Sequence, residues 1–152
     1  MKIYYREKSG GIEILRCFGI EGRVEIPGMI DGKLVISAAP YAFSSHMDEK
    51  EELKNASLWE VSDGLGFGRE EHVLAGNDVE EIVFPDTLKE IGRYIFYGCG
   101  NLKKLEFSDS LMQIGCGAFT GCHALEKLTV HMRQGKKSGV KEMLGEMWQR
   151  ID

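Results

Sequence analysis

One pattern occurs twice in the chain, first as Val79-Glu-Glu-Ile-Val-Phe-Pro-Asp-Thr-Leu-Lys-Glu-Ile-Gly92. It returns 23 residues later as Leu102-Lys-Lys-Leu-Glu-Phe-Ser-Asp-Ser-Leu-Met-Gln-Ile-Gly115. Apolar and glycine positions between Phe84 and Cys99 recur unchanged in the second copy, whereas the positions between them differ. Self-similarity at an interval of about 20–50 residues is typical of solenoids, in which each repeat forms one coil of a stack. The sequence therefore predicts stacked coils, a fold whose surface can serve many partners.

The same interval extends the pattern in both directions. Forward, it reaches Leu125-Glu-Lys-Leu-Thr-Val130, the strand half of a further unit. Backward, it reaches residues 55–63, a degenerate unit that matches residues 101–109 at Asn, Glu, Ser and Asp. An earlier unit begins at Arg23, with insertions at residues 28–34 and 44–54. We therefore expect about five parallel strands.

Each unit has a strand half and a return half. In Leu102-x-x-Leu105-x-Phe107 the apolar residues alternate with polar ones, which is the period of a strand buried on one face. A turn follows at residues 108–110, where Ser and Asp side chains can bond their own backbone. Leu111 to Phe119 then has the spacing of a short helical or irregular return segment, with Gly115 and Gly121 relieving crowding at the bends.

The two ends of the chain differ from the repeats. Two apolar runs flank residues 8–11, Lys-Ser-Gly-Gly, which predicts a β-hairpin cap over residues 1–22. Ser138 is the expected N-cap of a C-terminal cap helix within residues 131–152, with an apolar stripe formed by Val140, Leu144, Met147, Trp148 and Ile151. Ser44 or Ser45 is the expected N-cap of a surface helix running through residues 48–52. The prediction is a single α/β domain over residues 1–152, with the repeats at 23–130 between the two caps.

Composition limits the classes of function. The chain has 152 residues, 43% of them hydrophobic and 28% charged, and a net charge of −5. A domain of this length can bury a core, and the negative charge argues against binding nucleic acid or anionic membranes. Residues 1–7 lack the apolar run of a secretory signal, and no segment is long enough for membrane insertion, so we expect a cytoplasmic protein. Its four cysteines are expected to be reduced.

Several of these motifs resemble the BspA-like leucine-rich repeat family. They are Ile-Pro-x-x-Ile-x-Gly-Lys-x-Val at residues 26–35, Leu-Lys-Glu-Ile-Gly at 88–92 and Ala-Phe-Thr-Gly-Cys at 118–122. The resemblance covers residues 23–130 and implies a short leucine-rich repeat solenoid without catalytic residues. Members of that family are common in gut-associated anaerobic bacteria, often secreted or attached to the cell surface, and are implicated in adhesion. The resemblance thus implies cell-surface or secreted localisation as the alternative to the cytoplasm.

The cysteines allow two interpretations. Cys99 and Cys122 occupy one column of adjacent coils, which predicts a ladder of buried thiols and also permits a disulfide or a metal site. Cys116, Cys122 and His123 are the ligand set of an alternative, a small metal-binding protein or enzyme, although their spacing is not a zinc pattern. No arrangement of nucleophile, base and orienting group is visible, so we expect no catalysis, no cofactor and no metal. The glycine-rich segments at residues 64–68 and 135–138 are interpreted as linkers.

The outward face of the sheet is the remaining candidate site. Period-two alternation places two columns of side chains there: Arg23, Leu58, Glu81, Lys104 and Lys127, and beside them Glu25, Glu60, Val83, Glu106 and Thr129. Such a face can bind a protein partner, or its charges can simply pair across strands. We predict a non-catalytic protein–protein interaction module that is a monomer or weak homodimer, with the insertion at residues 44–54 as the alternative recognition element.

Overall fold

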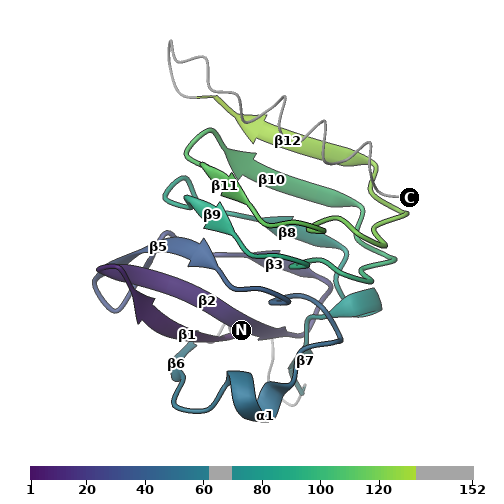
Figure 1. Cartoon of the computed structure of the whole chain (residues 1–152). Coiled ribbons are helices and arrows are strands. Elements are labelled where there is room, and N and C mark those ends of the chain that lie inside the picture. Colours follow the sequence, from purple (N-terminus) through teal and green to yellow (C-terminus); the bar gives the residue numbers. More distant parts are fainter. Residues whose placement is uncertain (62–69, 133–152) are drawn as a thin grey trace.

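The computed structural model describes residues 1–61 and 70–132 and consists of two sheets around one core (Figure 1). Its elements are β1 (Lys2–Lys8), β2 (Gly11–Gly19), β3 (Arg23–Glu25), β4 (Met29–Ile30), β5 (Lys33–Ala38), α1 (Glu49–Glu52), β6 (Ser57–Glu60), β7 (His72–Val73), the 3-10 helix Gly76–Asp78, β8 (Glu81–Val83), β9 (Glu90–Ile91), β10 (Lys104–Ser108), β11 (Gln113–Ile114) and β12 (Lys127–His131). The coils stack from the hairpin at the N-terminus toward β12.

The parallel sheet contains the repeat strands in the order β12-β10-β8-β3. Lys104 is paired with Glu81 on one side and with Lys127 on the other, so the register follows the 23-residue interval. Arg23 is paired directly with Glu81. The predicted stack of parallel strands is therefore confirmed, with four strands in this sheet.

The predicted fifth member of that sheet lies elsewhere. β6 pairs antiparallel with β1, where Trp59 is opposite Ile3, so the degenerate unit at residues 55–63 is not a coil and that interpretation is wrong. Its matches to residues 101–109 are polar residues, of which Asn55 and Glu60 are exposed, whereas the apolar anchors that follow them in a true repeat are missing. With β3 already paired to β8, this segment adds instead to the open edge of the hairpin.

The second sheet is formed by the hairpin and the return segments, in the order β11-β9-β5-β2-β1-β6, with β4 and β7 attached at its side. The return segments are two-residue strands rather than helical turns, and Gln113 is paired with Glu90 at the same 23-residue interval. Coils stacked at strand spacing bring the backbone N–H groups of one return segment to the carbonyls of the next, which explains the added strands. At the bend, a Cβ on Gly115 would lie 2.1 Å from the backbone nitrogen of Arg93, which confirms the crowding predicted there.

Aromatic rings fill the space between the sheets. Phe43, Phe96 and Phe119 stack in successive coils, with centroid distances of 6.0 and 5.7 Å. Beside them, Phe84 and Phe107 stack at 4.9 Å. Phe96 and Phe119 therefore occupy the same slot in adjacent coils, as predicted, and all five rings are buried.

The N-terminal cap is the predicted hairpin. β1 and β2 pair antiparallel, and the turn between them has positive φ at Ser9 (52°) and Gly10 (81°). β2 then pairs in parallel with β5, which joins the cap to the first coil.

Arg16 on β2 closes the buried end of the stack. Its guanidinium donates to the carbonyls of Tyr41, Ala42 and Ser44 at 3.1, 3.2 and 2.6 Å, and its side chain is 2% exposed. Glu49 of α1 accepts from the same guanidinium. Burial lowers the pKa of Arg16, and the hydrogen bond to Glu49 opposes that effect.

The insertion after Phe43 contains the expected surface helix in shortened form. α1 has no buried residue, and Asp48 is its N-cap, accepting from the backbone N–H groups of Lys50 and Glu51. The prediction of Ser44 or Ser45 as the cap is wrong, because Ser44 is buried in the bend and its hydroxyl accepts from the N–H of His46. The C-terminal cap helix and the segment 135–138 lie outside the described residues. No helix within the described residues has the length and apolarity needed to cross a bilayer.

Candidate interaction surface

The outward face of the parallel sheet carries eight of the ten predicted site residues. One column runs through Arg23, Glu81, Lys104 and Lys127, and the next through Glu25, Val83, Glu106 and Thr129. The inward residues between these columns, such as Ile82 and Leu105, are fully buried. The alternation therefore presents both columns to the outside of the molecule.

Leu58 and Glu60 are not part of this face. They lie on β6, at the edge of the second sheet, where they are paired with Tyr4 and Lys2. Glu60 lies 4.0 Å from the ammonium of Lys2, and Leu58 is 46% exposed. The candidate surface is thus smaller than the sequence predicts.

Charges on the face are distributed unevenly. At the β3 end, the guanidinium of Arg23 lies 3.4 Å from the carboxylate of Glu25 and 3.6 Å from that of Glu81. At the β12 end, Glu106 lies 3.2 Å from Nε2 of His131. The acidic groups of the face are therefore each engaged by a neighbour.

Two lysines at the β12 end make no such ion pair, although Lys104 also lies opposite Glu81, which is bound by Arg23. Lys104 and Lys127 are directly paired on adjacent parallel strands, and both are exposed. Within residues 1–61 and 70–132, neither ammonium makes an ion pair. Like charges opposite each other on neighbouring strands are destabilising, so this pair is a feature that folding alone does not favour.

The cysteines separate into two environments. The thiol of Cys99 donates to the carbonyl of Phe43 at 3.2 Å, and that of Cys122 donates to the carbonyl of Phe96 at 3.3 Å. Both are free thiols buried in the core, which confirms the predicted ladder. Burial raises the pKa of Cys122 to about 12 and that of Cys99 further still.

The alternative ligand set does not come together. Cys122 is buried against Phe96, whereas Cys116 and His123 are exposed. In the part of the chain that the structure describes, no three His, Cys, Asp or Glu side chains are placed to hold a metal ion. The interpretation of Cys116, Cys122 and His123 as one site is therefore wrong.

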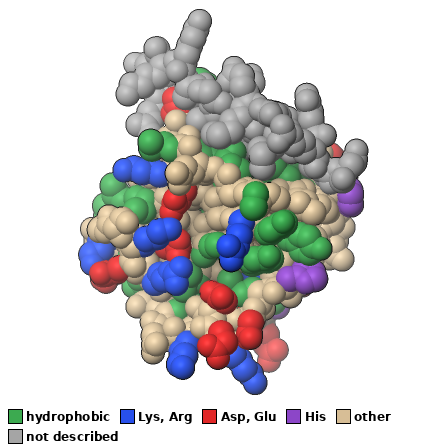
Figure 2. Space-filling model, viewed as in Figure 1, with side chains coloured by type: hydrophobic (Ala, Val, Ile, Leu, Met, Phe, Trp, Pro, Cys, Tyr) green, Lys and Arg blue, Asp and Glu red, His purple; other side chains and the backbone are tan. Residues whose placement is uncertain are grey.

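A polar network on the second sheet was not predicted. Glu13 is 2% exposed and forms ion pairs with Arg6 at 2.6 Å and Lys8 at 3.0 Å. Lys8 also contacts Glu90 at 2.5 Å, and the hydroxyl of Ser37 donates to both carboxylates. In Figure 2, charged side chains of both signs form a band over this face. The corresponding sequence feature is the pair of charged residues within the apolar run of β2, a strand that is buried on both faces.

Comparison with known proteins places the repeats in a family. The model of the BspA type leucine-rich repeat region, with six copies, matches residues 70–139. A leucine-rich cell surface protein from Faecalibacterium prausnitzii A2-165 is similar in structure, with a TM-score of 0.55 and 20% identity over 85% of this chain. This chain spans 30% of the length of that protein.

A second solved structure, the leucine-rich repeat protein of T. pallidum, aligns over 94% of this chain and 92% of its own, at 15% identity and a TM-score of 0.39. None of the curated proteins matches the chain in sequence at a significant level. The repeat interval, the stacked coils and this match show that residues 70–139 are similar to BspA-type leucine-rich repeats.

Proposed function

We propose that the chain is a non-catalytic protein-binding module that recognises an acidic segment of a partner through Lys104 and Lys127. The observation that carries this proposal is the pairing of two exposed lysines on adjacent strands, while the carboxylates of the same face are engaged by Arg23 and His131. A partner carboxylate near both ammonium groups would relieve their repulsion. The family supports a scaffold for protein interaction, because stacked repeats present extended binding surfaces.

A double charge reversal tests the proposal. Lys104→Glu with Lys127→Glu is expected to leave folding almost unchanged, since exposed charges contribute little to stability. Affinity for the partner, first captured from cells by cross-linking and then purified, is expected to fall at least about tenfold with a weaker dependence on salt. Surface binding with purified components measures both.

A charge-matched variant in the insertion at residues 44–54, Lys50→Glu with Lys54→Glu, is the control. It has the same change in net charge but lies on the insertion. Retained affinity in this control and lost affinity in the sheet variant support the proposal. The opposite result assigns recognition to the insertion at residues 44–54 and contradicts the sheet surface.

The proposed binding function could operate in the cytoplasm or at the cell surface, and the location of the protein distinguishes the two. The sequence predicts the cytoplasm, whereas the resemblance implies adhesion at the cell surface or after secretion. A cell surface location is what the F. prausnitzii protein is described as having, and its similarity to this chain is one of fold. Protease treatment of intact producing cells distinguishes them, because only a surface protein is cleaved while cytoplasmic markers stay intact.

A further inference from the structure

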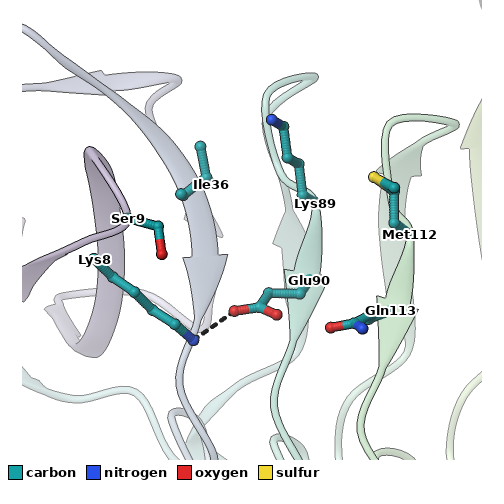
Figure 3. Close-up of a pocket in the computed structure, with 7 residues that line it drawn as sticks. All are labelled: Lys8, Ser9, Ile36, Lys89, Glu90, Met112 and Gln113. Atoms are coloured by element: carbon teal, nitrogen blue, oxygen red, sulfur yellow. Dashed lines mark hydrogen bonds and ion pairs between the residues drawn. The ribbon is translucent and has the colours of Figure 1, made fainter.

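A groove of about 430 Å³ lies on the second sheet, across the core from the lysine pair. It is formed where the hairpin turn meets the return segments of the coils, and it is lined by Lys8, Ser9, Ile36, Lys89, Glu90, Met112 and Gln113 (Figure 3). None of these residues belongs to the surface proposed above. The groove is therefore a separate place at which a partner can bind.

A β-bulge places Ile36 at the groove. The pairing of β2 with β5 shifts register between Ile12 and Glu13. Ile12 is therefore opposite Val35 and Glu13 is opposite Ser37, so no residue of β2 is paired with Ile36. The side chain of Ile36 lies over Gly11, where a Cβ would be 2.8 Å from it. Bulges re-aim a side chain in this way, and they are common next to functional sites.

Ile36 begins a column that continues through the next two coils. The N–H of Lys89 donates to the carbonyl of Ile36 at 2.8 Å, and the N–H of Met112 donates to that of Lys89 at 2.6 Å. The three side chains point the same way in Figure 3, and Met112 is 72% exposed. The repeat conserves identical residues in the core of these coils but places three different side chains in this column, so stacking does not dictate them.

Charge is unbalanced along the same column. Lys8 and Glu90 neutralise each other at the floor of the groove, with Glu13 and Ser37 completing the network. Lys89 is exposed, and it makes no ion pair within residues 1–61 and 70–132. The groove thus offers one uncompensated cation between two apolar side chains, Ile36 and Met112.

We infer that the groove binds an extended peptide segment of a partner protein in which apolar residues lie two positions before and two positions after an acidic residue, so that all three side chains face the groove. The carboxylate pairs with the ammonium of Lys89, and the apolar side chains contact Ile36 and Met112. Methionine suits such a role, because its flexible thioether adapts to different apolar partners. This surface is additional to the lysine pair of the parallel sheet and does not depend on it.

Peptide titrations of the full-length ¹⁵N-labelled protein test the inference by NMR. The probe is an acetylated and amidated Gly-Leu-Gly-Glu-Gly-Leu-Gly peptide, in which the Leu and Glu side chains share one face, and the matched peptides carry Gln or Lys in place of Glu. The acidic peptide is expected to shift the amide signals of Ile36, Lys89 and Met112 and to bind about tenfold more tightly than the Gln peptide, because a charge-assisted contact is replaced by a neutral one. The Lys peptide is expected to bind more weakly still.

Variants then separate the two parts of the groove. Lys89→Gln is expected to abolish the preference for the acidic peptide, whereas Lys104→Gln on the opposite sheet is expected to keep it. Met112→Ser is expected to weaken the acidic and Gln peptides by the same factor. All three replaced side chains are exposed, so the folded spectrum serves as the internal check on each variant.

Three results would overturn the inference. They are equal binding of the acidic and Gln peptides, equal shifts from acetate alone, and shifts confined to the signals of Lys104 and Lys127. The last result would leave the proposed sheet surface intact while removing the groove, so failure of one proposal is distinguishable from failure of the other.

Discussion

Equivalent backbone carbonyls of successive coils receive their hydrogen bonds from different donors in the inner coils and at the N-terminal end of the stack. The carbonyls of Ile95 and Ala118 each accept from the N–H of the preceding coil, at Phe43 and Phe96. Ala42 occupies the equivalent position in the first coil, where no repeat precedes it, and its carbonyl accepts from Arg16. In the interior, backbone N–H groups of the neighbouring coil thus satisfy these carbonyls, whereas at the end a buried charged side chain is required.

The largest expected effect is the difference in thiol reactivity between the buried cysteines and the exposed one. Cys99 and Cys122 in the ladder and Cys17 at the hairpin end are buried, and burial raises the pKa of Cys17 to about 12. Because the thiolate is the reactive form, exposed Cys116 is expected to react with a thiol reagent at least about a hundredfold faster than the other three. Mass spectrometry after a labelling time course measures each site.

Unfolding in denaturant is the control, since all four thiols should then react at similar rates. Fast native labelling of Cys99 and Cys122 would contradict the ladder. Fast labelling of Cys17 alone would show that the hairpin end opens more readily than the interior, which would sharpen the comparison.

Replacing one of the stacked phenylalanines of the core by alanine tests the packing of the inner coils. Phe96→Ala or Phe119→Ala is expected to reduce the free energy of unfolding by about 3–5 kcal/mol, because each removes a buried ring from a stack in which a neighbour cannot fill the gap. Urea denaturation followed by circular dichroism measures the loss. Met112→Ala, at an exposed position, should change the midpoint little, and wild-type midpoints for both Phe variants would contradict the stacking register.

Most of the interior could be predicted from the sequence because it repeats. The 23-residue interval places Lys104 beside Lys127, and the earlier unit stacks on the repeats, where Ala38 is opposite Ile91. The prediction for residues 55–63 was wrong, since matches at four polar residues do not specify a core. The two-residue strands β9 and β11 are too short to show a period, so the second sheet was missed.

The buried charges at the N-terminal end of the stack and the groove on the second sheet could not be predicted, because neither follows from the repeated pattern. Glu13 and Arg16 are single charged residues between apolar neighbours in β2, and isolated charged residues in a strand are usually expected to face solvent. Only the packing of the first coil and of Lys8 over them buries both. The groove beside them depends on a bulge at Ile36, which leaves no pattern in a single sequence.

Replacement of Arg16 tests whether the end depends on its charged side chain. Arg16→Met keeps an unbranched apolar chain but leaves the carbonyls of Ala42 and Ser44 without a donor among the described residues, whereas that of Tyr41 still accepts from the N–H of Ser44. Unpaired buried groups cost about 1–3 kcal/mol each, so we expect a loss of about 3 kcal/mol in urea denaturation. Arg23→Met, at a half-exposed position, is the control. If the two variants unfold at the same midpoint, water satisfies the end of the stack and the contrast with the interior fails.

The ion pair of Lys8 with Glu90 has the smallest expected effect, because both side chains are partly exposed to solvent. The hydrogen bond from Lys8 lowers the pKa of Glu90, so folding favours the ionised carboxylate. Its stabilisation is complete above the usual glutamate value of 4.5 and is lost as the pH falls through the lowered value in the folded protein. Lys8 stays charged in this range, because the same contact raises its pKa. Glu90→Gln should therefore reduce stability by less than about 1 kcal/mol at pH 7. The difference from wild type should disappear in acid, whereas the exposed Glu80→Gln should show no such convergence. A difference that persists unchanged to pH 2 would mean that Glu90 contributes through packing rather than charge, and that the floor of the groove is held by Ser37 and Glu13 alone.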